Sequence, residues 1–170
     1  MSQPGVKQSV VVQLEAPRFE NGTPLLIAGL RNRYTAETMN NIPAQWQRFA
    51  PHIGKIPGQV GSVVYGLCFN ALSPEGIDYL AGVEVSSSSG LPGEFSVATV
   101  PAQKYAVFLH REHVSKLRET LDAIHKWLPG SSLEPAGGTA GAPDFFELYS
   151  EEFDPRTGMG GMEVWIPIKS

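Results

Sequence analysis

The sequence predicts an α+β fold built from two pseudo-symmetric modules that form one mostly antiparallel sheet with the helices on one side. Two observations predict it. Each half of the chain reads as strand, amphipathic helix, strand and strand, over residues 9–85 and again over 100–169. The repeat of about 80 residues is too long for a solenoid, whose repeats are roughly 20–50 residues. Two such halves can pair, and the crevice between them is a natural place for a ligand.

The first module is expected to begin with a half-buried strand, because Val10, Val12 and Leu14 alternate with polar residues. Asn21-Gly22 is the best short-range hairpin signal of the chain, and the strand is expected to continue over residues 25–30. A helix should then follow the N-cap residue Thr35, because apolar side chains recur at helical spacing: Met39, Ile42, Trp46 and Phe49. Pro43 should start a turn or kink the helix. The strands 65–70 and 79–85 close this module.

The second module repeats this order with a clearer helix. A strand over residues 102–108 precedes it, and Pro129-Gly130 stops it after Trp127. One face of this helix is an apolar stripe: Val114, Leu117, Leu121, Ile124 and Leu128. The strands 145–153 and 163–168 complete the module. Gly-, Ser- and Pro-rich loops are expected at 86–93, between the halves, and at 131–143.

Length and composition indicate one folded domain over residues 9–170, after a loose N-terminus at 1–8. The net charge of −4, with scattered basic residues, argues against direct nucleic-acid binding. A single cysteine excludes an internal disulfide and a cysteine-ligated zinc site, and we expect neither a metal nor a cofactor. No segment has the apolar length of a membrane span, and the first residues lack a signal core. The expected compartment is therefore the cytoplasm.

The strand that begins at Phe145 carries the best candidate site. Side chains alternate across a strand, so Phe145, Glu147 and Tyr149 share a face. A carboxylate between two rings on an inner face is costly unless it is paired. One interpretation is that Glu147 awaits a cationic or hydrogen-bond-donating ligand, with the rings adding cation–π attraction. The other is that Glu147 meets an internal Arg, Lys or Tyr and stabilises the sheet.

The last strand is expected to direct Glu163 and Trp165 away from the helices, toward Glu147 and Tyr149. Alternatively, Trp165 simply covers the sheet. Tyr65 and Phe69 form the matching face of the first module. The predicted ligand-binding residues are therefore Glu147, Tyr149, Trp165, Tyr65, Phe69, Phe145 and Glu163, with no metal ligands and no evident catalytic triad.

Several segments, in their order and spacing, resemble the GyrI-like small-molecule-binding domain. This domain is the effector-binding half of many AraC-type and MerR-type transcription regulators. The resemblance runs from about residue 8 to 169 and rests on Tyr65–Asn70, Tyr79–Val85, Pro101–Phe108, Trp127–Pro129, Phe146–Tyr149, Glu152–Pro155 and Glu163–Lys169.

The resemblance implies that the sheet is curved and that the ligand lies in the cleft between the modules. Ligands of this family are often bulky, aromatic or cationic, and a buried glutamate on the penultimate strand, here Glu147, commonly meets the positive charge. Leu148, at a position expected to be polar, and a lengthened loop at 137–142 depart from the pattern. The chain shows no DNA-reading segment, so we expect a ligand-binding domain that stands alone.

Three functions remain open at this point. The first, which we favour, is a sensor or sequestering protein for small hydrophobic or cationic molecules, of the multidrug-binding kind. The second is an inhibitor that binds a protein partner, a regulator or DNA gyrase, as a monomer or a dimer. The third is a hydrolase of strained electrophilic rings in which Glu147 activates water and Tyr149 assists.

Overall fold

The computed structural model describes residues 14–70, 75–136 and 142–169. One sheet of eight antiparallel strands runs in the order β1-β6-β8-β7-β3-β4-β2-β5. The first module contributes β1 (Arg18–Gly22), β2 (Leu25–Tyr34), β3 (Gln59–Phe69) and β4 (Ile77–Val85). The second contributes β5 (Ser96–Val100), β6 (Gln103–His110), β7 (Phe145–Tyr149) and β8 (Met162–Ile168).

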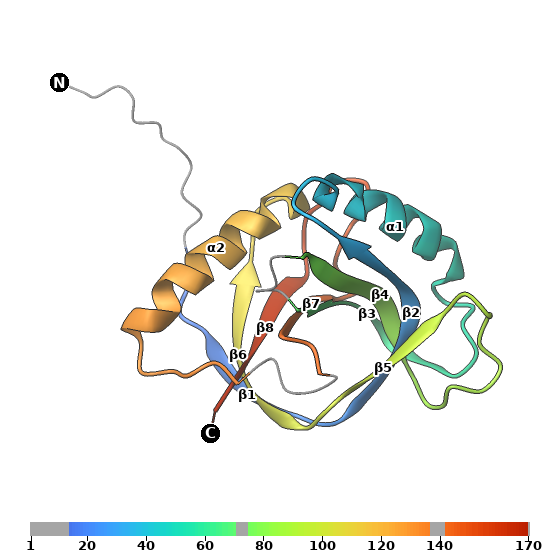
Figure 1. The fold of residues 1–170 in the computed structure, drawn as a ribbon, viewed down its shortest axis with the longest axis horizontal. Coiled ribbons are helices and arrows are strands. Elements are labelled where there is room, and N and C mark those ends of the chain that lie inside the picture. The colour runs from blue at the N-terminus through green and yellow to red at the C-terminus, as the bar shows by residue number, and fades with distance from the viewer. Residues whose placement is uncertain (1–13, 71–74, 137–141, 170) are drawn as a thin grey trace.

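The predicted repeat is confirmed by this strand order, which reads the same from both ends when β1 to β4 are exchanged with β5 to β8. The modules meet where β3 pairs with β7, with Gly66 opposite Glu147. The helices α1 (Ile42–Phe49) and α2 (Leu117–Trp127) lie on the same side of the sheet (Figure 1). Short 3-10 turns flank both helices, at Met39–Asn41, Ala50–His52, Val114–Lys116 and Leu128–Gly130.

The hairpin predicted at Asn21-Gly22 is wrong. β1 pairs with β6 of the other module, and β2 pairs with β4 and β5, so β1 and β2 are not neighbours. Likewise β5 continues into β6 through Pro101 and Ala102. The segment from β1 to β2 and the segment from β5 to β6 both cross the bottom of Figure 1. Each module thus lends its first strand to the other, and the sheet curls so that its second face is enclosed.

Other boundaries also differ from the prediction. Strand β5 was not predicted, and β7 ends at Tyr149 rather than Phe153 because Ser150–Phe153 forms a turn. Helix α1 begins at Ile42, since Thr35 and Thr38 form a separate turn and Pro43 occupies the first turn of the helix. The strand expected from Val10, the loose terminus at 1–8 and most of the loop 137–142 lie outside the described residues.

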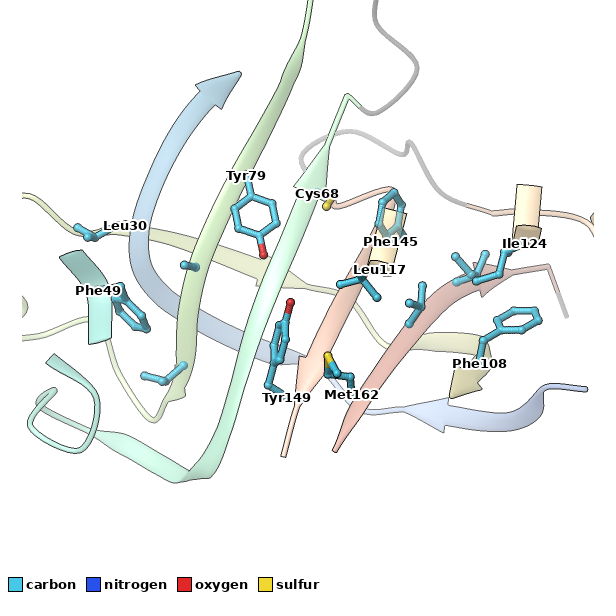
Figure 2. Close-up of a cluster of buried hydrophobic side chains, with 14 of the residues drawn as sticks. Leu30, Phe49, Cys68, Tyr79, Phe108, Leu117, Ile124, Phe145, Tyr149 and Met162 are labelled. Carbon is cyan, nitrogen blue, oxygen red and sulfur yellow. The ribbon is translucent and has the colours of Figure 1, made fainter. Parts of the chain in front are cut away.

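The sheet separates two apolar layers. The helix-side layer lies between the sheet and the helices; it includes Phe49, Tyr79, Phe108, Ile124 and Tyr149 (Figure 2). The concave-side layer fills the inside of the curl; it includes Ile27, Leu67, Leu80, Tyr105 and Phe146. Both faces of the central strands are therefore buried, and each alternate residue of β7 enters a different layer.

A substitution at Phe49 tests the contribution of the helix-side layer to stability. Its ring is fully buried at the end of α1 and packs 6.1 Å from the rings of Trp46 and Phe95, centroid to centroid. Phe49→Ala should lower the free energy of unfolding by about 3–5 kcal/mol, the usual cost of deleting a buried phenyl ring. Phe19→Ala, which removes a ring that is 51% exposed, should change it by only about 0.5 kcal/mol. Urea denaturation of both variants measures the difference, and equal losses would contradict the core assignment.

Candidate functional site: a buried glutamate under the helices

The predicted site residues divide between the two faces of the sheet. Directly paired residues of neighbouring strands share a face, and the register pairs Tyr65 with Leu148 and Trp165 with Phe146. Phe145, Glu147 and Tyr149 share one face, as expected from their alternation, and that face is the one toward the helices. The other four predicted residues face the concave side: Tyr65, Phe69, Glu163 and Trp165.

The expectation that all seven residues share one cleft is thus wrong. Val164 lies opposite Glu147, so its neighbours Glu163 and Trp165 point to the far side of the sheet from Glu147. The prediction that Glu163 and Trp165 face away from the helices was itself correct. The error was the assumption that Glu147 faces away from them too.

Glu147 accepts two hydrogen bonds from phenols. The hydroxyl of Tyr79, on β4, donates to Oε1 at 2.6 Å, and that of Tyr149 donates to the same oxygen at 2.9 Å. Figure 2 shows the two hydroxyls, on the same face of the sheet, directed toward each other across strand β3. In the described part of the chain, Oε2 has no hydrogen-bond partner and no basic side chain forms an ion pair with Glu147. The carboxylate is therefore buried with half of its hydrogen-bonding capacity unused.

A tryptophan from α1 covers this group. Trp46 Nε1 donates to the Tyr79 hydroxyl at 3.0 Å, and the indole packs edge-on against Tyr79 and Tyr149 at centroid distances of 6.2 and 5.3 Å. Trp46 is partly exposed, whereas Glu147 is 8% exposed. Trp46 is thus the partly exposed member of the group, and it is hydrogen-bonded to Tyr79, one of the two tyrosines that donate to Glu147.

Gly66, on β3, leaves room for the carboxylate. It lies directly opposite Glu147, and a Cβ atom there would overlap the Tyr79 hydroxyl and come within 2.7 Å of Glu147 Oε1. The backbone of β3 thus approaches the glutamate and Tyr79 too closely for any side chain. Phe145, two residues before Glu147, extends the same face and packs 6.3 Å from the His125 ring of α2.

Burial sets the electrostatics of this group. Desolvation raises the pKa of Glu147, although the hydrogen bonds from Tyr79 and Tyr149 act in the opposite direction. Burial and the charge of Glu147 raise the pKa of both tyrosines well above the usual value. The phenols therefore remain protonated donors, and the negative charge of Glu147 is stabilised less well than in water. A cation that reached Oε2 would stabilise the negative charge of Glu147.

Trp46 and Tyr79 were not predicted as site residues. Their patterns placed Trp46 on a helical stripe and Tyr79 in an apolar strand, which also describes ordinary core residues. Only the pairing of β3 with both β4 and β7 brings Tyr79 to Glu147, across 68 positions of sequence. No signal within either segment specifies that pairing.

Among the concave-side candidates, Glu163 is already paired. Arg18 donates to both of its oxygens, at 2.9 and 3.2 Å, and Trp165 Nε1 donates at 2.9 Å. Phe69 lies under the guanidinium of Arg31, whose Cζ is 4.1 Å from the ring centroid. Within the described ranges, no three His, Cys, Asp or Glu side chains cluster as metal ligands, and no helix is long and apolar enough to cross a membrane.

The fold and this group define a two-module ligand-binding type of domain with an incompletely satisfied carboxylate beneath its helices. The chain belongs to the family of GyrI-like small-molecule-binding domains, whose model matches residues 15–169. The resemblance noted in the sequence is therefore confirmed.

A curated relative and two solved structures agree with this assignment. The transcriptional regulator BrlR of Pseudomonas aeruginosa is 35% identical over 127 residues, which are 72% of this chain and 44% of BrlR. The chain thus spans less than half the length of that regulator. A structure of SAV2435 bound to tetraphenylphosphonium matches with a TM-score of 0.71 at 22% identity, over 92% of this chain and 95% of that one. The C-terminal domain of EcmrR matches with a TM-score of 0.65 at 12% identity, over 92% and 98%. Both structures show the shared fold.

The raised pKa of Glu147 predicts a pH-dependent stability. Above the ordinary glutamate pKa of 4.5, the unfolded chain has released this proton while the folded chain still holds it. The folded state then binds more protons, so the free energy of unfolding falls as pH rises through this window. Glu147→Gln should remove this contribution, so its stability relative to the wild type should increase as pH rises from 4.5 through the raised pKa of Glu147.

Urea denaturation at a series of pH values measures this difference. Glu151→Gln, the same chemical change in the exposed turn after β7, is the matched control and should follow the wild type at every pH. A constant gap between wild type and Glu147→Gln across the series would contradict the assignment.

Proposed function

We propose that this protein binds small hydrophobic organic cations at Glu147, as a sensor or a sequestering protein. The observation that carries the proposal is the buried carboxylate whose Oε2 has no partner among the described residues and whose Oε1 is held only by neutral phenols. A buried charge of this kind is normally paired, and a cation supplied by a ligand would complete the pairing.

The residues around Glu147 suit such a ligand. Trp46, Tyr149 and Phe145 offer aromatic faces, which attract cations and bury apolar area. In the related structure, SAV2435 is bound to tetraphenylphosphonium, a bulky aromatic cation, and BrlR is a transcriptional regulator. Both support an effector-binding role, in which a bound cation changes what a regulator or another protein partner does. The cytoplasmic location of the protein remains a prediction from the sequence.

Access to Glu147 requires a rearrangement of the helix-side layer, because the carboxylate is almost wholly buried. The hydrogen bond from Trp46 to Tyr79 is the contact at the partly exposed edge of the group. A ligand that displaces the indole loses one neutral hydrogen bond, worth about 0.5–1.5 kcal/mol, and gains a charge-assisted contact worth about 1.5–3 kcal/mol. The exchange therefore favours a cation over a neutral compound of the same shape.

Charge selectivity tests the proposal directly. Tetraphenylphosphonium and tetraphenylborate have nearly the same shape and opposite charges, and calorimetry should show micromolar binding of the cation, about −8 kcal/mol, with much weaker binding of the anion. Glu147→Gln should weaken binding of the cation by roughly 10- to 100-fold, since a Coulomb attraction of up to about 3 kcal/mol between two charges about 6 Å apart is lost.

The anion should bind no more weakly to this variant than to the wild type, and Glu151→Gln should leave both affinities unchanged. Equal losses for the two ions in Glu147→Gln would show that the variant damages the site by shape alone and would remove Glu147 from its role.

A turnover assay separates binder from hydrolase. A raised pKa makes Glu147 a stronger base, so water addition to an activated ring is the one reaction that its surroundings favour. We expect no repeated turnover of such rings, because the proposal assigns Glu147 Oε2 to the cationic group of a ligand and not to a reacting water. Mass spectrometry of an epoxide or a reactive cyclopropane incubated with the protein decides this. Multiple turnovers that Glu147→Gln abolishes would replace the sensor with a hydrolase.

A further inference from the structure

A cavity lies on the concave face, on the other side of the sheet from Glu147. Its volume is about 240 Å³, and it opens beside the segment that joins β1 to β2. Aromatic and aliphatic side chains from five strands line it, together with the last two residues of β1 and one residue of that segment: Tyr65, Tyr105, Phe146, Leu148, Trp165 and Leu25, with Asn21, Gly22 and Thr23.

Four rings form its wall around Phe146. Trp165 stacks on Phe146 at a centroid distance of 5.4 Å and an interplanar angle of 18°. Tyr65 and Tyr105 meet Phe146 edge-on, at 5.6 and 5.4 Å. Gly22 contributes by its lack of a side chain, because a Cβ atom there would come 2.5 Å from the Tyr105 ring. The wall is thus suited to a flat aromatic guest.

The wall contains a buried phenol, that of Tyr65, whose hydroxyl is unpaired in the described part of the chain although the residue is only 8% exposed. Burial raises the pKa of Tyr65 to about 12, so the phenol is a neutral donor at physiological pH. Tyr105 differs, because its hydroxyl accepts from Gln103 Nε2 at 3.0 Å. A buried donor without an acceptor is costly, and a guest that supplies an acceptor removes the cost.

Among the described residues, no charged side chain lines the cavity, although Glu84 is near enough for its charge to add to the effect of burial in raising the pKa of Tyr65. Glu163, beside Trp165, is bound by both terminal nitrogens of Arg18 and by the Trp165 indole. The Arg18 and Glu163 charges satisfy each other, and the described lining holds no carboxylate, so this cavity differs in kind from the site of Glu147. It favours a neutral guest.

We propose that this cavity binds a neutral aromatic compound of one or two fused rings that carries a hydrogen-bond acceptor directed at Tyr65. Its size supports this class. A cavity of roughly 150 Å³ holds benzene, and drug-sized ligands occupy roughly 300–1,000 Å³. The site is independent of the function proposed for Glu147, and tetraphenylphosphonium, with four phenyl rings, is too large for it.

Quinoline and naphthalene test the proposal, because they share a shape and only quinoline has an acceptor nitrogen. Quinoline should bind about three- to ten-fold more tightly, the range expected of one neutral hydrogen bond. Tyr65→Phe should abolish this preference and leave naphthalene binding in place. Equal affinities of the two compounds for the wild type, or a preference that survives in Tyr65→Phe, would overturn the proposal.

The tryptophan indole N–H signals in a nitrogen-15 NMR spectrum locate the guest. Trp165 lines the cavity, Trp46 lies in the helix-side layer, and Trp127 is exposed at the end of α2. Quinoline should shift the Trp165 signal and leave those of Trp46 and Trp127 in place, whereas tetraphenylphosphonium should act on Trp46.

Leu148→Trp, which enlarges a half-buried residue of the cavity wall, should prevent binding of both two-ring compounds while its spectrum remains that of a folded protein. A quinoline shift at Trp46 alone, or undiminished quinoline binding by folded Leu148→Trp, would refute the second site. Either result leaves the Glu147 site to its own test.

Discussion

The burial of β7 on both of its faces is the constraint on which the rest of the structure depends. In most antiparallel sheets one face packs and the other meets water. Here the helices cover one face and the curl of the sheet encloses the other. Consecutive residues of β7 therefore enter separate apolar layers, and Phe146 and Glu147 lie on opposite faces of the sheet although they are adjacent in the chain. Two chemically distinct environments thus share one strand.

Within that constraint, Glu147 is a residue that lowers the stability of the folded state. An apolar side chain at this position would satisfy the helix-side layer at less cost, since a buried carboxylate loses its hydration. The structure lessens the cost with two phenol donors and a glycine on the facing strand, and leaves Oε2 without a partner in the described part of the chain. Departures from the best local packing of this kind concentrate at functional sites.

Much of the fold was predictable because the repeat appears in local patterns. The apolar stripe of α2, the proline-glycine stop after it and the alternation in β8 all lie within single segments. The faces of the site were not predictable in the same way. Alternation shows that Glu147 and Tyr149 share a face, but their relation to Trp165 depends on the register between β7 and β8, which long-range packing sets. Tyr79 joined the site for the same reason.

The exchange of first strands explains both the failed hairpin and the concave cavity. Asn21-Gly22 favours a tight turn, yet pairing β1 with β6 and β2 with β5 ties the two ends of the sheet to the opposite modules. Local turn preference is worth less than the ladder hydrogen bonds and the apolar area that this pairing secures. The same segment then passes over the open end of the curl, where Gly22 makes room for the Tyr105 ring. A hairpin at this position would have placed β1 beside β2 and left the concave layer, and the cavity within it, without its closing wall.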